Sequence, residues 1–396
     1  MKTEELLFYL LREELGEIKP SQEDVKEVRK GLFTEEKNSL FTLSKNHDIA
    51  HVVGNALANL ELISRADPCL SFFEKEALLA IYRCENQQHE YNKIKQVFIE
   101  EKIKFIPLKG LVIKDYYPKN IVRTSCDIDI LVSEEDLDRA RKILTSRLGY
   151  KEGKAINYRD YVFVSESKVK IELHFSLREG MDGVDAVLEK VWDYASKVGQ
   201  TTEYRMTNEF IIFYLIAHTS YHFIGGGCGI KPILDLYVLE KSLELDDLSL
   251  KQMLEKGKLE RFYEVAKKLK SVWFMGKESD ENIDKVAGFI LRGGAYGSRE
   301  NATIISNAKT GSRVKYFFSR LFLPYKKLKL VYPILQKHKW LFPIFQVVRW
   351  FSCLFGSRSE NRANEMSVLF SAKKKEIEAA KTLLKEVGLY QENTQN

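Results

Sequence analysis

Two aspartates inside a short apolar run, Asp127 and Asp129, are the residues of this chain best suited to chemistry. They lie in Cys-Asp-Ile-Asp-Ile-Leu-Val at residues 126–132, a run typical of a buried strand. Side chains two positions apart on a strand point to the same face, so the two carboxylates should converge. Burying them is costly without positive charge nearby. The pair therefore predicts a divalent cation, with Mg²⁺ favoured because it prefers oxygen ligands and Mn²⁺ as the alternative.

A possible anion site precedes this pair. Lys109 and Gly110 stand between a short predicted strand and a predicted helix over 111–117. A glycine lets the backbone approach a ligand closely, and a helix N-terminus carries partial positive charge. Arg123, four residues before Asp127, could bind a phosphate through two hydrogen bonds. Lys109, Gly110 and Arg123 are therefore the candidate phosphate contacts.

A further acidic residue follows on a predicted hairpin. After a predicted helix over 134–148, strands at 161–164 and 169–175 flank a turn. In the second strand Glu172 and His174 share one face, because side chains alternate along a strand. The apolar residues that alternate with them, Val169, Ile171 and Leu173, should face a core.

This order of residues resembles the nucleotidyltransferase fold of the DNA polymerase β superfamily. More narrowly, it is similar to a bacterial family of uncharacterised nucleotidyltransferases with Lys-Gly, an Arg before Asp-Ile-Asp-Leu-Val, and then Glu-Leu-His. Residues 100–178 carry the match. Two features depart from the wider superfamily. The turn is Lys109-Gly110 where Gly-Gly or Gly-Ser is usual, and the interval from Gly110 to Asp127 is longer than the common one.

The resemblance implies a Mg²⁺-dependent transfer of a nucleoside monophosphate from an NTP, with ATP among the donors, and release of pyrophosphate. It implies that Asp127, Asp129 and Glu172 form the catalytic set and hold up to two metal ions. Glu172 would hold the metal on the nucleophile's side or act as a general base. His174 would lie next to the metal ligands. The acceptor stays open among a small molecule, a peptide, a protein and an RNA.

Three further polar residues are expected close to this site. His218 and His222 are four residues apart in a predicted helix over 211–223, which places both on one face. They could bind a metal, but the spacing indicates no third ligand. A polar stripe facing the site, or a hydrogen-bonded pair in the core, is favoured. Asp235 should pair with one of them or with a basic residue. The glycine-rich run 225–229 lacks the residues of a P-loop and is interpreted as a helix–helix loop.

Positive charge is concentrated near the C-terminus. The 396 residues carry a formal net charge of +6, but residues 309–359 contain eleven Lys and Arg and no Asp or Glu. This segment is also rich in aromatic residues. Helices that pack an aromatic face on a core are the favoured interpretation. Peripheral contact with an anionic membrane comes second, and nucleic acid third.

The remaining composition favours a cytoplasmic protein, with or without membrane-peripheral contact. No uninterrupted apolar run reaches the ~18 residues of a transmembrane helix. The N-terminus lacks the basic and apolar regions of a signal peptide. The five cysteines are scattered and form neither a disulfide framework nor a zinc motif.

The expected fold is α+β, with a small mixed sheet of the nucleotidyltransferase type flanked by N- and C-terminal helical regions. The expected divisions are a helical region at 1–100, the catalytic core at 101–180, a helical domain at 181–300 and the basic aromatic region at 301–396. Three local expectations are a single helix at 248–270, a linker at 292–312 and a last helix at 371–387. A catalytically inactive nucleotide-binding or membrane-peripheral protein on the same fold is the alternative function.

Overall fold

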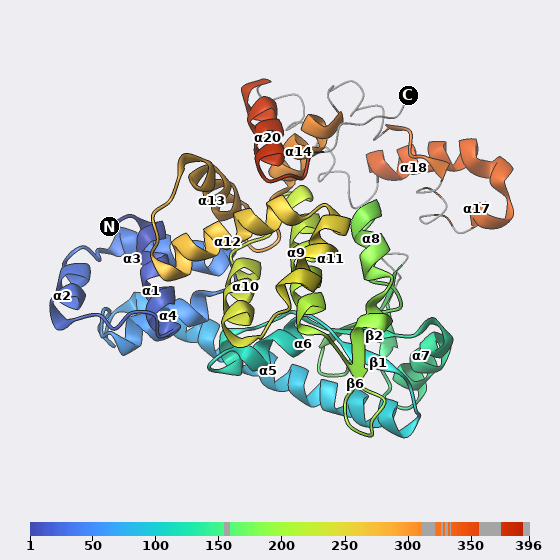
Figure 1. The fold of residues 1–396 in the computed structure, drawn as a ribbon, viewed down its shortest axis with the longest axis horizontal. Coiled ribbons are helices and arrows are strands. Elements are labelled where there is room, and N and C mark those ends of the chain that lie inside the picture. Colours follow the sequence, from blue (N-terminus) through green and yellow to red (C-terminus); the bar gives the residue numbers. More distant parts are fainter. Residues whose placement is uncertain are drawn as a thin grey trace.

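The computed structural model describes residues 1–153, 159–310, 321–325, 328, 332, 334–355 and 374–390. Helices predominate in these residues, and they surround a five-stranded sheet that is accompanied by a two-stranded hairpin (Figure 1). Helical segments precede and follow the sheet along the chain. The predicted α+β class with a small mixed sheet is therefore confirmed.

The central sheet places the two acidic strands side by side. Its spatial order is β1 (Phe105–Pro107), β2 (Asp127–Val132), β5 (Lys170–His174), β4 (Asp160–Val164) and β3 (Lys151–Glu152). β2 and β5 run parallel, and the other neighbouring strands pair antiparallel. Asp129 lies opposite Glu172 in this register. Because paired residues point to the same face, the acidic side chains of both strands share one side of the sheet.

The opposite side of the sheet is anchored in an apolar core. Ile128 and Ile171 lie in one buried cluster with side chains of α5 (Pro68–Glu100) and α7 (Leu137–Ser146). The predicted helix at 134–148 is shorter, because its first turn, Glu134–Asp136, is a 3₁₀ helix. This packing fixes the alternation of both strands and turns the carboxylates away from the core.

The N-terminal region consists of helices that pack on the rest of the molecule. They are α1 (Thr3–Glu14), α2 (Gln22–Lys30), α3 (Thr34–Asn46), α4 (Ala50–Asn59) and α5. Sequence signals mark their starts. Ser21 and Asp24 form a reciprocal capping box at α2, and the Asp67 side chain accepts a hydrogen bond from the Cys69 amide at the start of α5. One buried cluster extends from Leu6 of α1 to Leu389, after the last helix.

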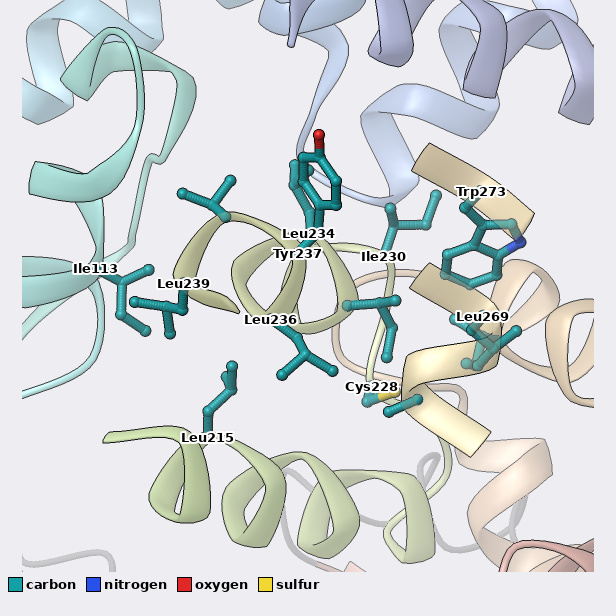
Figure 2. Close-up of a cluster of buried hydrophobic side chains, with 14 of the residues drawn as sticks. Ile113, Leu215, Cys228, Ile230, Leu234, Leu236, Tyr237, Leu239, Leu269 and Trp273 are labelled. Carbon is teal, nitrogen blue, oxygen red and sulfur yellow. The ribbon is translucent and has the colours of Figure 1, made fainter. Parts of the chain in front are cut away.

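Helix α10 (Lys231–Ser242) occupies the centre of that cluster. Figure 2 shows it between Leu215 of α9 (Asn208–Ile224) and the side chains Leu269 and Trp273 of α12 (Glu260–Met275). Every residue from 233 to 239 is buried, which is typical of a helix enclosed on all sides. An acidic residue within such a helix needs a partner inside the protein.

Short elements connect the sheet to these helices. α6 (Gly110–Ile113) follows β1, and α8 (Asp182–Leu188) follows β5. A hairpin of β6 (Ala195–Lys197) and β7 (Tyr204–Met206), which the sequence did not predict, borders β1. The Phe105 amide donates to the Thr202 carbonyl at 3.2 Å. Strands this short, with polar residues among them, carry little periodic signal.

Two of the local expectations are wrong. The single helix at 248–270 is divided into α11 (Asp247–Gly257) and α12, because Lys258 adopts a left-handed conformation with φ 56° and ends α11. Within the expected linker, α14 (Arg299–Thr310) is a helix that follows α13 (Glu281–Gly293). Ile305 and Ala308 of α14 are buried, and this packing outweighs the weak helix propensity of the segment.

The C-terminal region is described in parts. Residues 311–320, 326–327, 329–331, 333 and 356–373 of the basic aromatic region lie outside the described residues. The described parts include α17 (Ile334–Lys337), α18 (Phe342–Phe355) and α20 (Lys374–Glu386), whose predicted first residues, 371–373, are also outside. α20 packs against α14. In the described part of the chain, no helix has both the length and the apolar composition needed to cross a bilayer.

Candidate active site

The carboxylates of β2 and β5 line a cavity of about 400 Å³. Asp127, Asp129 and Glu172 come from the sheet. The other side, the helix side, is built by α9, α10, the loop that joins them and the segments that carry Asp48, Arg123 and Tyr296. Lys109, Gly110, Arg123, His218, His222 and Asp235 line the same cavity. The structure therefore brings together residues that are up to 126 positions apart in the chain.

Asp129 is the most tightly held of the three acids. It is 3% exposed, and its Oδ1 atom accepts hydrogen bonds from Lys109 Nζ at 2.9 Å and from His174 Nε2 at 2.8 Å. Burial alone would raise the pKa of Asp129, but Lys109 and His174 hold it well below its usual range. Asp129 is therefore ionised at any physiological pH.

Asp127 is in the opposite situation. Burial and the charge of Asp129 raise the pKa of Asp127 to about 6. Its neighbouring cation, Lys170, lies 3.9 Å away and pairs more closely with Glu172. Glu172 is also 3.5 Å from His174 Nε2, and this contact lowers its pKa to about 2 against the effect of burial. Asp127 thus lacks the close positive neighbour that Asp129 and Glu172 have.

The cluster has the donor chemistry of a metal site. Asp129, Glu172 and His174 each offer one ligand atom, and these atoms lie within 4.8 Å of one another. This trio differs from the predicted set, in which Asp127 stood in place of His174. Asp127 is next to it on the same strand face. Three carboxylates suit Mg²⁺, and the imidazole nitrogen extends the fit to Mn²⁺.

Lys109 reaches Asp129 from an unusual backbone conformation. It has φ 48° and ψ −121°, and the Leu111 amide donates to the Leu108 carbonyl at 3.2 Å. This is a type II′ turn, whose second position favours glycine. Gly110 is required for another reason, because a Cβ there would lie 2.9 Å from Ser125. The turn therefore accepts a cost of about 1–3 kcal/mol to place the lysine ammonium on Asp129.

Arg123 forms an ion pair with Asp235. Its Nε donates to Asp235 Oδ1 at 2.7 Å, and its Nη2 donates to Asp235 Oδ2 at 2.9 Å. The Tyr117 hydroxyl donates to Asp235 Oδ1 at 2.7 Å. Asp235 thus pairs with a basic residue, one of the two kinds of partner expected for it. Arg123 lines the cavity while it is paired with Asp235.

The two histidines of α9 form a hydrogen-bonded chain. His218 Nδ1 lies 2.8 Å from Glu179 Oε1, and His222 Nε2 lies 3.0 Å from His218 Nε2. Burial lowers the pKa of both, that of His222 to about 3. Because Glu179 can only accept, His218 donates to it through Nδ1 and accepts from His222 at Nε2. The two histidines thus line the cavity and are hydrogen-bonded to each other, so this arrangement has features of both favoured expectations, the polar stripe and the hydrogen-bonded pair.

Several residues of the cavity were not predicted. Arg159 pairs with Glu179, and Lys231 pairs with Asp48 and donates to the Thr124 carbonyl at 3.0 Å. These pairs join distant parts of the chain and leave no local pattern. Lys170, by contrast, shares the strand face of Glu172, so the same alternation could have identified it.

The glycine-rich run at 225–229 is a helix–helix loop, as predicted. It connects α9 to α10 and packs against a second loop, where a Cβ on Gly226 would lie 2.6 Å from the Ser298 carbonyl oxygen. The second loop places Tyr296 at the cavity, and its hydroxyl is 3.1 Å from Cys126 Sγ. Because these glycines have no side chain, the backbones of the two loops can lie in close contact.

The family comparison agrees with this geometry. A protein-family model described as an uncharacterised nucleotidyltransferase matches residues 34–275. The match includes the sheet, α9, α10 and every predicted site residue. It confirms the resemblance noted from Lys109-Gly110, Arg123, the aspartate strand and Glu172. None of the curated proteins matches the chain.

Proposed function

Because this chain belongs to a family of uncharacterised nucleotidyltransferases, we propose that it transfers a nucleoside monophosphate from an NTP to an acceptor and releases pyrophosphate. One observation carries the proposal. Asp127, Asp129 and Glu172 share one face of two paired strands, at a cavity large enough for a small molecule. Phosphoryl and nucleotidyl transfer depend on placing positive charge around a polyphosphate, and carboxylates provide the ligands for such metal ions.

We infer that Asp127, Asp129 and Glu172 hold Mg²⁺ or Mn²⁺, with His174 next to them. Ions bound there would neutralise the triphosphate and lower the pKa of the attacking group. The pKa of Asp127, raised by burial and by Asp129, supports this assignment because a cation would relieve the repulsion. The pKa of Glu172, near 2, favours metal binding over general-base action, since a base works best with a pKa near the working pH.

We propose that Lys109 contacts the triphosphate and Arg123 shapes the wall beside it. Lys109 already neutralises Asp129 at 2.9 Å, so a metal ion at that carboxylate would free its ammonium for a phosphate oxygen. The guanidinium of Arg123 donates two hydrogen bonds to the Asp235 carboxylate. Its contribution to phosphate binding is therefore expected to be smaller than that of Lys109.

The acceptor is proposed to bind against the side of the cavity formed by α9 and α10. Half of the lining side chains from these two helices are apolar or aromatic, namely Ile211, Tyr214, Leu215, Tyr221 and Pro232. Such a surface accommodates a small molecule, a peptide, a protein side chain or an RNA end. The Glu179–His218–His222 chain offers a neutral imidazole at the same side.

The proposal is tested by following the label of an NTP. Purified protein is incubated with cell extract and with each NTP labelled on the α-phosphate or, separately, on the γ-phosphate. We expect the α-label to enter one molecule while pyrophosphate forms, and both events to stop with EDTA or with Asp127→Asn. Transfer of the γ-label would show a kinase instead. Tight NTP binding without pyrophosphate in any extract would support the inactive nucleotide-binding alternative.

A further inference from the structure

Helix α18 presents an apolar face to solvent. Ile344, Val347 and Val348 are 52%, 42% and 43% exposed, and their spacing places them on one side of the helix. Trp340, in the 3₁₀ turn before the helix, is 71% exposed. In Figure 1, α17 and α18 (orange) lie at one edge of the molecule. An ordinary surface helix has the reverse orientation, with its apolar side toward the core.

The polar residues of α18 are turned inward. Gln346 and Arg349 are 5% and 6% exposed. Gln346 Nε2 donates to the Leu323 carbonyl, and Arg349 Nη2 donates to the Leu321 carbonyl at 2.8 Å. Rotating the helix to hide its apolar face would break these hydrogen bonds and expose their buried partners. The outward orientation is therefore fixed by specific contacts.

Aromatic packing fixes the same orientation. The ring of Phe342 meets that of Tyr325 edge to face, with centroids 5.8 Å apart, and the rings of Phe345 and Tyr332 are tilted to each other, with centroids 4.8 Å apart. The Trp350 indole donates to the Leu321 carbonyl at 2.6 Å. The inner side of α18 thus already has its partners among the described residues, whereas Ile344, Val347 and Val348 remain in contact with solvent.

The charged residues next to this face are basic. Lys337 and Lys339 are exposed beside Trp340, and residues 309–359 contain no acidic residue. An exposed aliphatic face beside lysines and a tryptophan suits the boundary between lipid headgroups and acyl chains. A nucleic acid would use the lysines but would offer nothing to the aliphatic side chains.

We propose that the outer face of α18, formed by Trp340, Ile344, Val347 and Val348, docks on an anionic membrane with the helix lying in the plane of the interface. Lys337 and Lys339 would contact the headgroups. No described helix is suited to span the bilayer, so the attachment is peripheral. The inference does not depend on the nucleotidyltransferase activity.

The test is flotation of the full-length protein with vesicles. One set contains phosphatidylcholine alone, and the other adds phosphatidylglycerol. We expect binding to the second set only, with binding that falls as salt rises. The triple variant Ile344→Ser, Val347→Ser, Val348→Ser should bind these vesicles more weakly by a factor of about ten or more, because it removes the inserted apolar area. A matched control, Leu78→Ser with Ile81→Ser on the exposed side of α5, should bind like the parent.

The charge contribution is tested separately. Lys337→Gln and Lys339→Gln should each weaken binding to the anionic vesicles by about fivefold, which corresponds to ~1 kcal/mol per lysine near such a surface. The conservative triple Ile344→Leu, Val347→Ile, Val348→Ile should retain binding. Thermal unfolding of every variant should match the parent, because the altered side chains are exposed.

Other outcomes would overturn the proposal. Vesicle binding that the serine triple leaves unchanged would place the contact elsewhere. Absence of vesicle binding together with salt-sensitive RNA binding would make the basic region a nucleic-acid surface. Concentration-dependent dimers that the serine triple dissociates, without vesicle binding, would show that a second copy of the chain covers α18.

Discussion

The two sides of the cavity hold their charges in different ways. On the helix side, each acid has at least one close base, as Arg123 for Asp235 and both Lys231 and Arg83 for Asp48. On the sheet side, Lys109 and His174 converge on a single oxygen of Asp129, while the nearest contact of Asp127 with a cation is 3.9 Å. The acids of the sheet side therefore compete for positive charge, whereas those of the helix side do not.

This difference indicates what each side is for. A buried acid with a close base fixes the position of the elements that the pair joins, and removing one partner is costly. Crowded carboxylates raise one another's pKa and leave a site that a cation would stabilise. The helix side thus holds the cavity in shape, and the sheet side remains available for a metal ion and its nucleotide.

The largest expected effect is a loss of activity, without a loss of stability, when one acid on the sheet side is replaced. Asp127→Asn should lower NTP turnover by about a thousandfold or more, because it removes a proposed metal ligand. Its free energy of unfolding should equal or exceed that of the parent, since the ionised carboxylate is disfavoured in the fold. Pyrophosphate release and urea unfolding measure the two effects. A large loss of stability in this variant would show that the Asp127 carboxylate supports the fold.

The matching change on the helix side should have the opposite consequence. Asp235→Asn leaves the buried guanidinium of Arg123 without its counter-charge, so we expect a loss of about 3–5 kcal/mol in the free energy of unfolding. Urea titration of the variant beside Asp127→Asn provides the measurement. If both variants unfold at the same urea concentration, the two sides do not differ as described.

The pH dependence of stability should sharpen the distinction. The pKa of Asp127 is raised from 3.8 to about 6 in the fold. Below 3.8 the group is protonated in both states and has no effect. As the pH rises toward 6 the unfolded chain ionises first, so the metal-free parent should lose up to about 3 kcal/mol relative to Asp127→Asn. The difference in free energy of unfolding between the parent and Asp127→Asn should stay constant above about pH 6. A difference that does not change from pH 4 to pH 7 would show that the pKa of Asp127 is not raised in the fold.

The smallest expected effect concerns the turn at Lys109. Lys109→Ala should weaken triphosphate binding more than nucleoside binding, because its proposed partner is an oxyanion. Lys109→Gly should weaken triphosphate binding as much as Lys109→Ala does. Its free energy of unfolding should be about 1 kcal/mol higher than that of Lys109→Ala, since only glycine tolerates φ 48° without cost. Equal stability of the two variants would show that the turn relaxes.

Local patterns predicted the sheet side well. Alternation along each strand placed Asp127 with Asp129, and Glu172 with His174, because a buried apolar face leaves one register for each strand. The lysine and glycine before a predicted helix indicated Lys109, and the resemblance added the roles of these residues. What the pattern did not contain was the competition among these groups, since the closeness of His174 to Asp129 depends on how β2 and β5 pair.

The helix side was mostly beyond local prediction. Arg123 and Asp235 are 112 positions apart, and nothing near either residue identifies the other. Arg159 and Glu179 were missed for the same reason. Errors in the helices have a related cause. Lys258 ends α11 through its backbone conformation, and α14 forms because Ile305 becomes buried, which the polar composition around it conceals.

We propose that the three acids of the sheet side bind a divalent cation together with an NTP. Isothermal titration calorimetry tests it directly, with NTP added to the protein in the presence of Mg²⁺, in the presence of Mn²⁺, or with EDTA. We predict binding with either metal, and none with EDTA or in Asp127→Asn, while Leu78→Ser binds like the parent. NTP binding of equal affinity in EDTA, or in Asp127→Asn with Mg²⁺, would show that these acids do not hold a metal ion with the nucleotide.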